Sequence, residues 1–367
     1  MTKIQETTLE INLPSLKENY HHLRSFLNPQ TKFMAVVKAY AYGSDSCEIA
    51  LFLEGLGVDY FAVAYTKEGV RLREAGVKTP IVVLHPLELH FKDLIKYNLQ
   101  PSIYSYPVLE SFLKVAKDQS HYPVHLKFNT GLNRLGFNAE ELPELLDKFD
   151  RQSHLKIASV FSHLGASEDL KEKHFTLNQI KVFKNIRNEV ISKLPYRPLF
   201  HMLNTSGILN YSSEAEFDMV RSGIGLYGFG NDPKYNSLFK PIASLKSIIS
   251  QIHHLKPGES VGYNRGYIVS GTMTTATIPL GHADGISRHY GQGKGFLILH
   301  GKKCPIVGNV CMDMLMIDVS GIQCKAGDEV VIFGPENNAA DLAMAGSTIS
   351  YELLTAISQR ITRKIVY

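Results

Sequence analysis

The sequence predicts two domains: an α/β TIM barrel, followed by a mostly antiparallel β-domain. Apolar runs and amphipathic helical patterns alternate through residues 1–230, and eight of the runs have the length and composition of strands. This number and this rhythm are typical of a TIM barrel. Beyond Gly230 the pattern changes to short alternating runs between turn signals, so we place the β-domain at residues 231–367.

The expected barrel strands are short apolar runs, many of them rich in β-branched residues. They cover residues 33–37, 60–64, 81–84, 102–104, 124–128, 157–161, 199–203 and 217–220. Helical patterns between them cover residues 66–75, 89–97, 108–117, 142–149 and 171–194. The chain opens with an extended segment at 8–13 that can pair with the second domain, and Pro14 and Ser15 then introduce a helix that reaches Leu27.

In the second domain, strands are expected at residues 243–252, 266–269, 274–278, 295–299 and 329–333. Residues 231–233 have the composition of a linker, and the one helical pattern covers residues 349–362. A β-domain appended to a catalytic barrel must cover either the barrel mouth of its own chain or that of a partner.

The composition excludes several classes of protein. At 367 residues, 44% hydrophobic and 20% charged, the chain is an ordinary globular protein with a large core. Its net charge of +4 is spread along the sequence, which does not favour a nucleic-acid or membrane partner. We expect a cytoplasmic protein, because its start lacks the apolar region of a signal peptide and no run has the length of a membrane span. The four cysteines lack the spacing of a metal site and are expected to be reduced thiols.

The run 33–37 ends at Lys38, where two interpretations are open. A lysine at a strand end is commonly a solvated terminus, whereas at the mouth of a β/α fold a desolvated lysine can form a Schiff base with a carbonyl compound. Other polar residues also follow expected strands, at the face where barrel active sites form: Asn129, Arg134, His163, Asn204 and Arg221.

A glycine-rich stretch, residues 220–228, follows the eighth expected strand. Glycine-rich turns are common and nonspecific, but the eighth loop of a barrel is a frequent phosphate site because its backbone N–H groups are free to bind an anion. Two interpretations of this stretch are therefore open: an ordinary glycine-rich turn, or a binding site for a phosphate group, which its position after the eighth strand favours.

Several motifs together resemble the alanine racemase family, and the resemblance covers nearly the whole chain. The matching stretches are residues 36–43, 127–136, 162–164, 204–205, 221–228, 262–263, 279–285 and 311–313. The sequence departs from the family pattern at Tyr40, where asparagine is usual, at Ser44 and Asp45, where histidine and glycine are usual, and at His282, where tyrosine is usual. These departures leave the range of substrates open.

The resemblance implies a pyridoxal-phosphate enzyme that acts as a homodimer and provides D-alanine for the bacterial cell wall. Lys38 would form the Schiff base, Arg221 would contact the pyridine nitrogen, and Tyr263 would be the second base, delivered by the other subunit. The implied cofactor-binding residues are Lys38, Tyr42, His163, Asn204, Thr205, Ser206, Arg221, Gly223, Ile224 and Tyr351. The implied substrate-binding residues are Arg134, Lys127, Met312 and Asp313, and Lys127 is carbamylated in many family members.

The chemistry of racemisation explains these residue types. A proton must leave one face of Cα and return to the other, so two acid/base groups must flank one plane. Lys38 would serve one face, and Tyr263 the other if a chain Arg221–His163–Tyr263 lowers the pKa of its phenol. Arg221 is a permanent cation without an acceptor, so it obliges the ring nitrogen to stay unprotonated, which weakens the electron sink and favours racemisation over transamination.

Four alternatives remain open. A related decarboxylase would carry an acidic residue at the pyridine nitrogen, which Arg221 does not match. A racemase of broader range, acting for example on serine, is compatible with Tyr40 and His282. A noncatalytic pyridoxal-phosphate carrier would not need Tyr263 or Met312, and a Schiff-base aldolase would not need the second domain.

Overall fold

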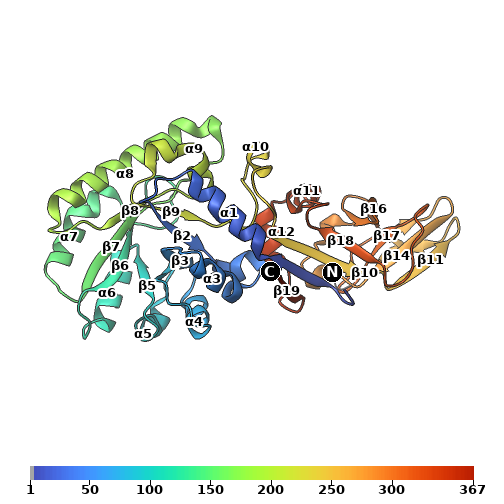
Figure 1. Ribbon diagram of the computed structural model, residues 1–367, viewed down its shortest axis with the longest axis horizontal. Helices are drawn as coiled ribbons and strands as arrows, with labels where there is room; N and C mark the ends of the chain where they lie inside the picture. Colours follow the sequence, from blue (N-terminus) through green and yellow to red (C-terminus); the bar gives the residue numbers. More distant parts are fainter. Residues whose placement is uncertain (1–3) are drawn as a thin grey trace. The chain divides into compact units, whose positions relative to one another are not determined.

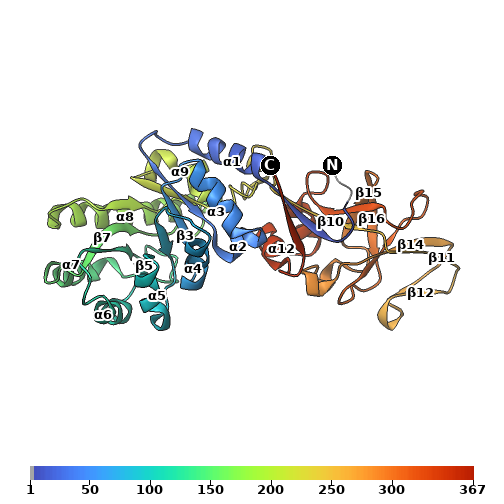
Figure 2. The same ribbon diagram turned by 60° about the horizontal axis from the view of Figure 1, so that its bottom comes forward.

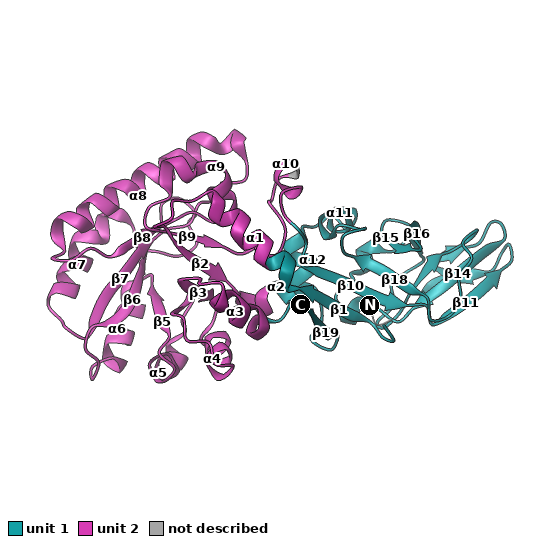
Figure 3. Ribbon diagram, viewed as in Figure 1, with its two compact units in different colours: residues 1–16, 42–45, 240–367 teal, residues 17–41, 46–239 magenta. Residues whose placement is uncertain are grey.

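The structure is a computed structural model that describes residues 4–367 (Figure 1). It divides into two compact units, coloured separately in Figure 3. The first, which we call the β unit, contains the residues up to Leu16, Tyr42–Asp45 and Lys240–Tyr367. The second, which we call the barrel unit, contains Lys17–Ala41 and Ser46–Phe239. The family of folds predicted from the sequence is confirmed in both units.

The barrel unit is built on eight parallel strands. They are β2 (Lys32–Val36), β3 (Tyr60–Val63), β4 (Ile81–Val83), β5 (Gln100–Ile103), β6 (Tyr122–Lys127), β7 (Leu155–Phe161), β8 (Leu199–His201) and β9 (Met219–Ser222). Their order is β8-β7-β6-β5-β4-β3-β2-β9. The ring closes between β8 and β9, where Asp218 N donates to Phe200 O over 3.1 Å and Arg221 N donates to Leu203 O over 3.0 Å.

Helices cover the outside of this ring (Figure 2). They are α1 (Leu13–Ser25), α3 (Ser46–Gly55), α4 (Thr66–Glu74), α5 (Phe91–Lys96), α6 (Tyr106–Val115), α7 (Leu142–Asp150), α8 (Lys173–Lys193) and α9 (Thr205–Ala215), with the short turns η1 (Glu88–His90), η2 (Ala139–Glu141) and η3 (Leu170–Glu172). Each packs with an apolar stripe of helical spacing: α7, for example, buries Leu142, Leu145, Leu146 and Phe149. The strands are mostly apolar on both faces because one side meets these helices and the other fills the barrel.

The β unit is a nine-stranded sheet with the order β11-β14-β17-β16-β15-β18-β10-β1-β19. The strands are β1 (Thr8–Asn12), β10 (Ala243–Ile248), β11 (Gln251–Leu255), β14 (Met273–Ile278), β15 (Phe296–Leu299), β16 (Lys302–Val307), β17 (Leu315–Asp318), β18 (Glu329–Phe333) and β19 (Thr362–Val366). A hairpin of β12 (Ser260–Val261) and β13 (Tyr267–Ile268) stands apart from it. All pairs in the large sheet are antiparallel except β1 with β19, so the opening of the chain is a strand of this unit.

Three expectations about the second domain were wrong in detail. The run 243–252 is broken into β10 and β11 at Ile249, whose N–H donates to Asp328 O instead of continuing one strand. The helix expected at 349–362 is only α12 (Ser350–Ala356), because the backbone is extended at Ile357 and the last residues pair with β1 as β19. The linker expected at 231–233 leads into a short helix, α10 (Pro233–Asn236), whose first turn is capped by the Asp232 carboxylate. A further helix, α11 (Ala339–Ala345), was not foreseen.

Three general features follow from the described residues. No helix within residues 4–367 is long and apolar enough to cross a membrane. None of the four cysteines, all of which lie within the described residues, forms a disulfide. Across the same residues, no group of three or more histidine, cysteine, aspartate or glutamate side chains is arranged to hold a metal ion.

Candidate active site

The polar residues that follow the barrel strands meet at the carboxyl ends of those strands. Lys38 lies two residues after the end of β2, Lys127 is the last residue of β6, His163 follows β7 and Arg221 lies in β9. Their charges act on one another: Arg134, Arg221 and Lys38 all lower the pKa of Lys127, together with burial, which is the largest cause. The residues expected at the mouth are therefore gathered in one cationic cluster, consisting of Lys38, Lys127, Arg134 and Arg221.

Lys38 begins an unusual turn, α2 (Lys38–Gly43), which is left-handed. The backbone φ angles of Ala39, Tyr40, Ala41 and Tyr42 lie between 53° and 56°, and Ala41 N donates to Val37 O over 3.0 Å. Left-handed helical residues other than glycine cost about 1–2 kcal/mol each. Four in succession are kept only where their surroundings hold them, which is characteristic of functional sites.

Arg221 is the centre of the polar contacts in the barrel. Its side chain is buried and donates from Nη1 to His201 Nδ1 over 2.6 Å, and from Nη2 to Ser162 O over 2.8 Å and to His163 Nδ1 over 3.1 Å. Burial lowers the pKa of Arg221 to about 9, which still leaves it a cation at neutral pH. Its Nε–H makes no hydrogen bond to any residue within 4–367, so one donor of the guanidinium stays available.

A chain of hydrogen bonds runs from Arg221 into the barrel interior. His201 Nε2 lies 2.9 Å from Ser159 Oγ, which lies 2.6 Å from His125 Nδ1, and His125 Nε2 lies 2.7 Å from Gln100 Oε1. Burial lowers the pKa of His125 to about 3 and that of His201 well below its ordinary value, so both rings are neutral. Because Arg221 can only donate, we infer that every bond in the chain points the same way, from Arg221 towards Gln100.

His163 is neutral for a similar reason. Burial and the charges of Arg221, Arg134, Lys127 and Lys38, in that order, hold its pKa well below the ordinary value. Since its Nδ1 accepts from Arg221, its proton lies on Nε2. The imidazole of His163 therefore has one N–H donor, at Nε2, that can bind an acceptor on the side away from Arg221.

Lys127 and Arg134 have no acidic partner among the residues that the structure describes. Lys127 is only 7% exposed, its pKa is lowered to about 8, and it makes no ion pair with any described carboxylate. Arg134 lies in an exposed loop that Asn129 folds by accepting from Gly131 N over 3.2 Å and from Asn133 N over 3.0 Å. A buried cation without a counter-charge is costly, so this arrangement is complementary to a bound anion.

Beside the cationic cluster, two backbone turns form an anion cradle. The helix α9 begins at Thr205 and Ser206 and is capped by Asn204, whose Oδ1 accepts from Gly207 N over 2.8 Å. The turn after β9 starts with Gly223 and Ile224, whose carbonyls accept from Leu226 N and Tyr227 N. The first N–H groups of such a turn have no acceptor within it and are available to an anion.

The two turns are fastened to each other. Thr205 Oγ1 lies 2.9 Å from Ser222 Oγ and accepts from Gly225 N over 3.3 Å. A Cβ at Gly225 would come within 2.7 Å of Thr205 Cγ2, so only glycine allows this close approach. Thr205 and Ser206 are both buried, with the Ser206 hydroxyl accepting from Asn231 Nδ2 over 3.1 Å.

The β unit brings together Tyr42 and Tyr351, the two tyrosines expected at the phosphate. Their ring centroids are 5.8 Å apart. Tyr42 is 8% exposed, and burial followed by the charge of Tyr351 raises its pKa above the ordinary value, so the phenol stays protonated.

Tyr263, Met312 and Asp313 line one open groove of about 670 Å³ in the β unit. Tyr263 is 74% exposed and Met312 is 59% exposed. The Asp313 carboxylate is occupied, because it accepts from Arg360 Nη2 over 2.7 Å, while Arg360 Nε donates to Asp284 Oδ1 over 2.6 Å. A Cβ at Gly281 would lie 2.2 Å from Met312 O, so the backbone of the Pro-Leu-Gly segment packs directly against the backbone at Met312.

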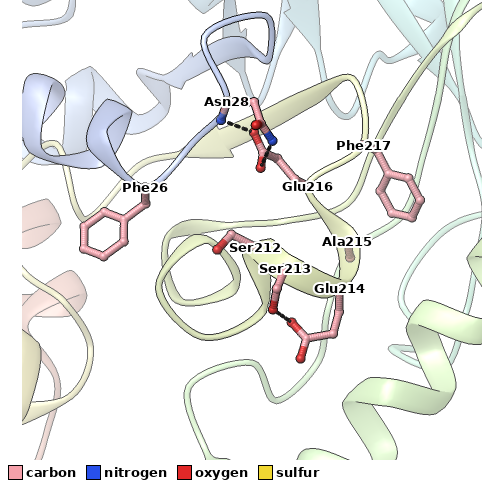
Figure 4. A pocket seen from close by; sticks show the side chains of 8 residues that line it. All are labelled: Phe26, Asn28, Ser212, Ser213, Glu214, Ala215, Glu216 and Phe217. Carbon is pink, nitrogen blue, oxygen red and sulfur yellow. Dashed lines mark hydrogen bonds between the residues drawn. The ribbon is translucent and has the colours of Figure 1, made fainter.

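A second cavity, of about 500 Å³, lies at the opposite end of the barrel strands (Figure 4). It is lined by residues just after α1 and just before β9, including Phe26, Asn28 and Phe217. Its most connected residue is Glu216, which accepts from Asn28 N over 2.6 Å and Nδ2 over 2.8 Å. These bonds tie two segments together, so we regard the cavity as a structural junction and not as the site.

The chemistry of the barrel mouth fits pyridoxal phosphate. A lysine with a pKa lowered by burial and by Arg134 can supply a neutral amine, and the cationic cluster and the anion cradle suit a ligand with several negative charges. Sequence reasoning missed His125, Ser159 and His201. Their signal was available, since each is a buried polar residue of a strand that is largely apolar.

Comparisons with known proteins point to the same family over nearly the whole chain. A family model described as alanine racemase, N-terminal domain, matches residues 11–231, and one described as alanine racemase, C-terminal domain, matches residues 242–365. The alanine racemase of Thermodesulfovibrio yellowstonii is 39% identical over 97% of both chains, and that of Treponema denticola is 36% identical over 98% of both. A solved alanine racemase of Clostridium difficile superposes with a TM-score of 0.93 at 31% identity, covering 99% of this chain and 96% of its own. The chain therefore belongs to the alanine racemase family.

Proposed function

We propose that this protein interconverts L-alanine and D-alanine with pyridoxal phosphate, using two bases on opposite faces of the substrate. The observation that carries the proposal is the cationic cluster around Lys38, in which three cations lack any acidic partner within residues 4–367. A cofactor with a phosphate and a ring oxygen, together with an amino acid carboxylate, would supply the missing negative charge.

The cofactor would be held by residues at the barrel mouth and by two tyrosines of the β unit. Lys38 would bind it covalently, and the anion cradle formed by Thr205, Ser206, Gly223 and Ile224 would take its phosphate, with the hydroxyls of Tyr42 and Tyr351 as further donors. When bound, the cofactor withdraws electrons from the substrate Cα and makes its proton acidic.

Arg221 would decide which reaction follows. Its free Nε–H would face the ring nitrogen, and because a guanidinium cannot accept a hydrogen bond, Arg221 would keep that nitrogen unprotonated. The four acceptors of its other N–H groups fix its orientation, including His201 at 2.6 Å. This favours return of the proton to Cα, and hence racemisation over transamination.

Two groups would move the proton. Lys38 is a base on one face, since its lowered pKa increases the fraction of neutral amine. Tyr263 would serve the other face, with the Nε2–H of His163 donating to its phenolate and lowering the pKa of the phenol. The substrate carboxylate would be bound by Arg134 and by the backbone N–H of Met312, while Lys127 would support Arg134. Asp313, already paired with Arg360, would hold the Met312 loop in place.

The proposal includes a homodimer with shared sites, in which Tyr263 and Met312 come from the other subunit. Support comes from the open groove of the β unit, where both side chains are more than half exposed although both are apolar in large part. We further propose that the enzyme works in the cytoplasm and supplies D-alanine for the bacterial cell wall.

The experiment is a complementation assay. Lys38→Ala and Tyr263→Phe should each lower D-alanine formation from L-alanine by about 10²-fold, as expected when a general acid/base is lost. Co-expressed, they should recover roughly a quarter of wild-type activity, because half of the dimers are mixed and one of the two sites in each is intact. If heterodimers form and stay inactive, Tyr263 acts within its own chain.

The same preparation tests the range of substrates. L-serine and larger amino acids should be compared with L-alanine at equal concentration, by the rate at which each D-form appears. A wild-type protein that racemises serine as fast as alanine would make it a broad-specificity racemase, and one that binds the cofactor but racemises nothing would make it a carrier.

A further inference from the structure

We propose that Glu68 and Arg71, on one face of α4, form a clamp that holds the left-handed turn of Lys38 in its working conformation. Both are positioning residues, because they act on Lys38 through the backbone and side chain of the residues after it. The proposal rests on the proposed function of Lys38 and adds to it the residues that place the amine.

The Glu68 carboxylate joins two segments through their backbones. Its Oε1 accepts from Ala39 N over 2.6 Å, directly after Lys38. Its Oε2 accepts from Ala64 N over 2.7 Å and from Tyr65 N over 3.1 Å, at the end of β3. One side chain thus ties the start of the lysine turn to the neighbouring strand of the barrel.

Arg71 makes the second contact of the clamp. It lies one helical turn after Glu68, so both side chains project from the same side of α4. The Arg71 guanidinium carbon lies 5.0 Å from the centroid of the Tyr40 ring, which is within the range of a cation–π interaction. Ala39 and Tyr40 are consecutive residues of the turn, and α4 holds one by its N–H and the other by its ring.

The turn needs such a clamp because it does not hold itself. Residues 39–42 all have φ near 55°, a region that side chains other than glycine adopt at a cost. Ala39 and Tyr40 are exposed, so little packing fixes them. Without the carboxylate, the first N–H of the turn would lose its acceptor and the lysine would be free to leave its position.

Glu68 also sets the charge around the amine. The groups that face Lys38 are Arg134 from the loop after β6, Lys127 at the end of β6, His163 after β7 and Glu68 from α4. Burial and Arg134 lower the pKa of Lys38, and Glu68 opposes them. Removal of this one negative charge should therefore move the pKa of Lys38 further down.

Capture of pyridoxal phosphate by the full-length protein, freed of cofactor, tests the clamp. Covalent capture at Lys38 is measured by absorbance, fixed with borohydride and mapped by peptide mass across a range of pH. The variant is Glu68→Gln, which keeps the size of the side chain but turns an N–H group towards backbone donors.

Glu54→Gln is the matched control. Glu54 also accepts from backbone N–H groups, those of Lys78 over 2.8 Å and Thr79 over 2.6 Å, but these precede β4 at the far end of the strands from Lys38. Both variants lose the same kind of bond, so both should lower the thermal midpoint to a similar extent.

We expect Glu68→Gln to slow capture at Lys38 by about tenfold or more and to move the pH midpoint of capture to lower pH. Glu54→Gln should leave both the rate and the midpoint of capture unchanged. Equal capture by the two variants, or a midpoint that does not move down in Glu68→Gln, would overturn the proposal. If wild-type protein itself shows no capture at Lys38, the proposed function fails instead.

Should Glu68→Gln not fold, Arg71→Met separates the two contacts of the clamp. It removes the contact with Tyr40 and leaves the carboxylate in place, so capture should slow without a downward shift of the midpoint. If Arg71→Met captures the cofactor at the wild-type rate, Arg71 does not help to hold the turn.

Discussion

Unfolding of this protein at mildly acidic pH should take up protons on three histidines. His125 and His201 are buried within the barrel, and His163 faces four cations. Burial lowers the pKa of His125 to about 3 and that of the other two well below the ordinary value. All three are thus neutral in the folded chain at pH 5.5, while an unfolded histidine carries about 0.9 of a proton there.

The three histidines together should bind about 2.7 protons on unfolding at pH 5.5, and almost none at pH 7.5. Because the unfolded chain binds more protons, stability rises with pH in this window. The stability that these neutral histidines contribute is fully present above pH 6.5 and is lost as the pH falls towards their pKa values in the folded chain. Near pH 5.5 the free energy of unfolding should fall by about 3.7 kcal/mol for each pH unit. Lys127 does not contribute there, since a pKa of about 8 leaves it protonated in both states.

The assay is proton uptake on addition of urea to weakly buffered, cofactor-free protein, measured with a pH electrode. His125→Asn should reduce the uptake by about 0.9 proton, and its amide oxygen can still accept from Ser159. His174→Asn, at an exposed position of α8, is the control and should leave the uptake unchanged. An uptake below about one proton for the wild type, or an unchanged uptake in His125→Asn, would refute the reasoning that these rings are neutral.

Three further predictions concern the site. Arg221→Glu should lower racemisation and raise formation of the pyridoxamine product, because a carboxylate favours protonation of the ring nitrogen; product analysis per folded protein checks this, and no gain in pyridoxamine would contradict it. Lys127 should be carbamylated in bicarbonate buffer, since its pKa of about 8 leaves a reactive neutral fraction and a carbamate would pair with Arg134; a carbon-13 bicarbonate spectrum without a carbamate signal would argue against it. Tyr263→Phe should slow exchange of the Cα proton of L-alanine with deuterated water far more than that of D-alanine, and equal slowing would remove Tyr263 from the L face.

The fold was largely predictable because its signals are local. Each barrel strand is a short apolar run, and each helix has a stripe of apolar residues, so the eight-stranded barrel follows from spacing alone. The β unit was harder. The helix expected at 349–362 ends early, at Ala356, and the distant pairing with β1 makes the segment that begins at Thr362 a strand.

The site was predictable where residues carry chemistry at strand ends, and not where they act through others. Lys38, His163 and Arg221 stand beside the ends of apolar runs. Glu68 looks like any solvated glutamate of an amphipathic helix, and its bond to Ala39 depends on a left-handed turn that no local signal announces. His201 is similar, since its role exists only through the 2.6 Å contact with Arg221, twenty residues away.

The most direct test of the central claim is to identify the lysine that binds the cofactor. The purified protein should carry an absorbing covalent complex with pyridoxal phosphate. Reduction with borohydride followed by peptide mapping should place the label on Lys38, and Lys127→Met should leave the label there. A label on Lys127 or any other lysine, or a protein that acquires no label when saturated with pyridoxal phosphate, would contradict the assignment of the barrel mouth as the active site.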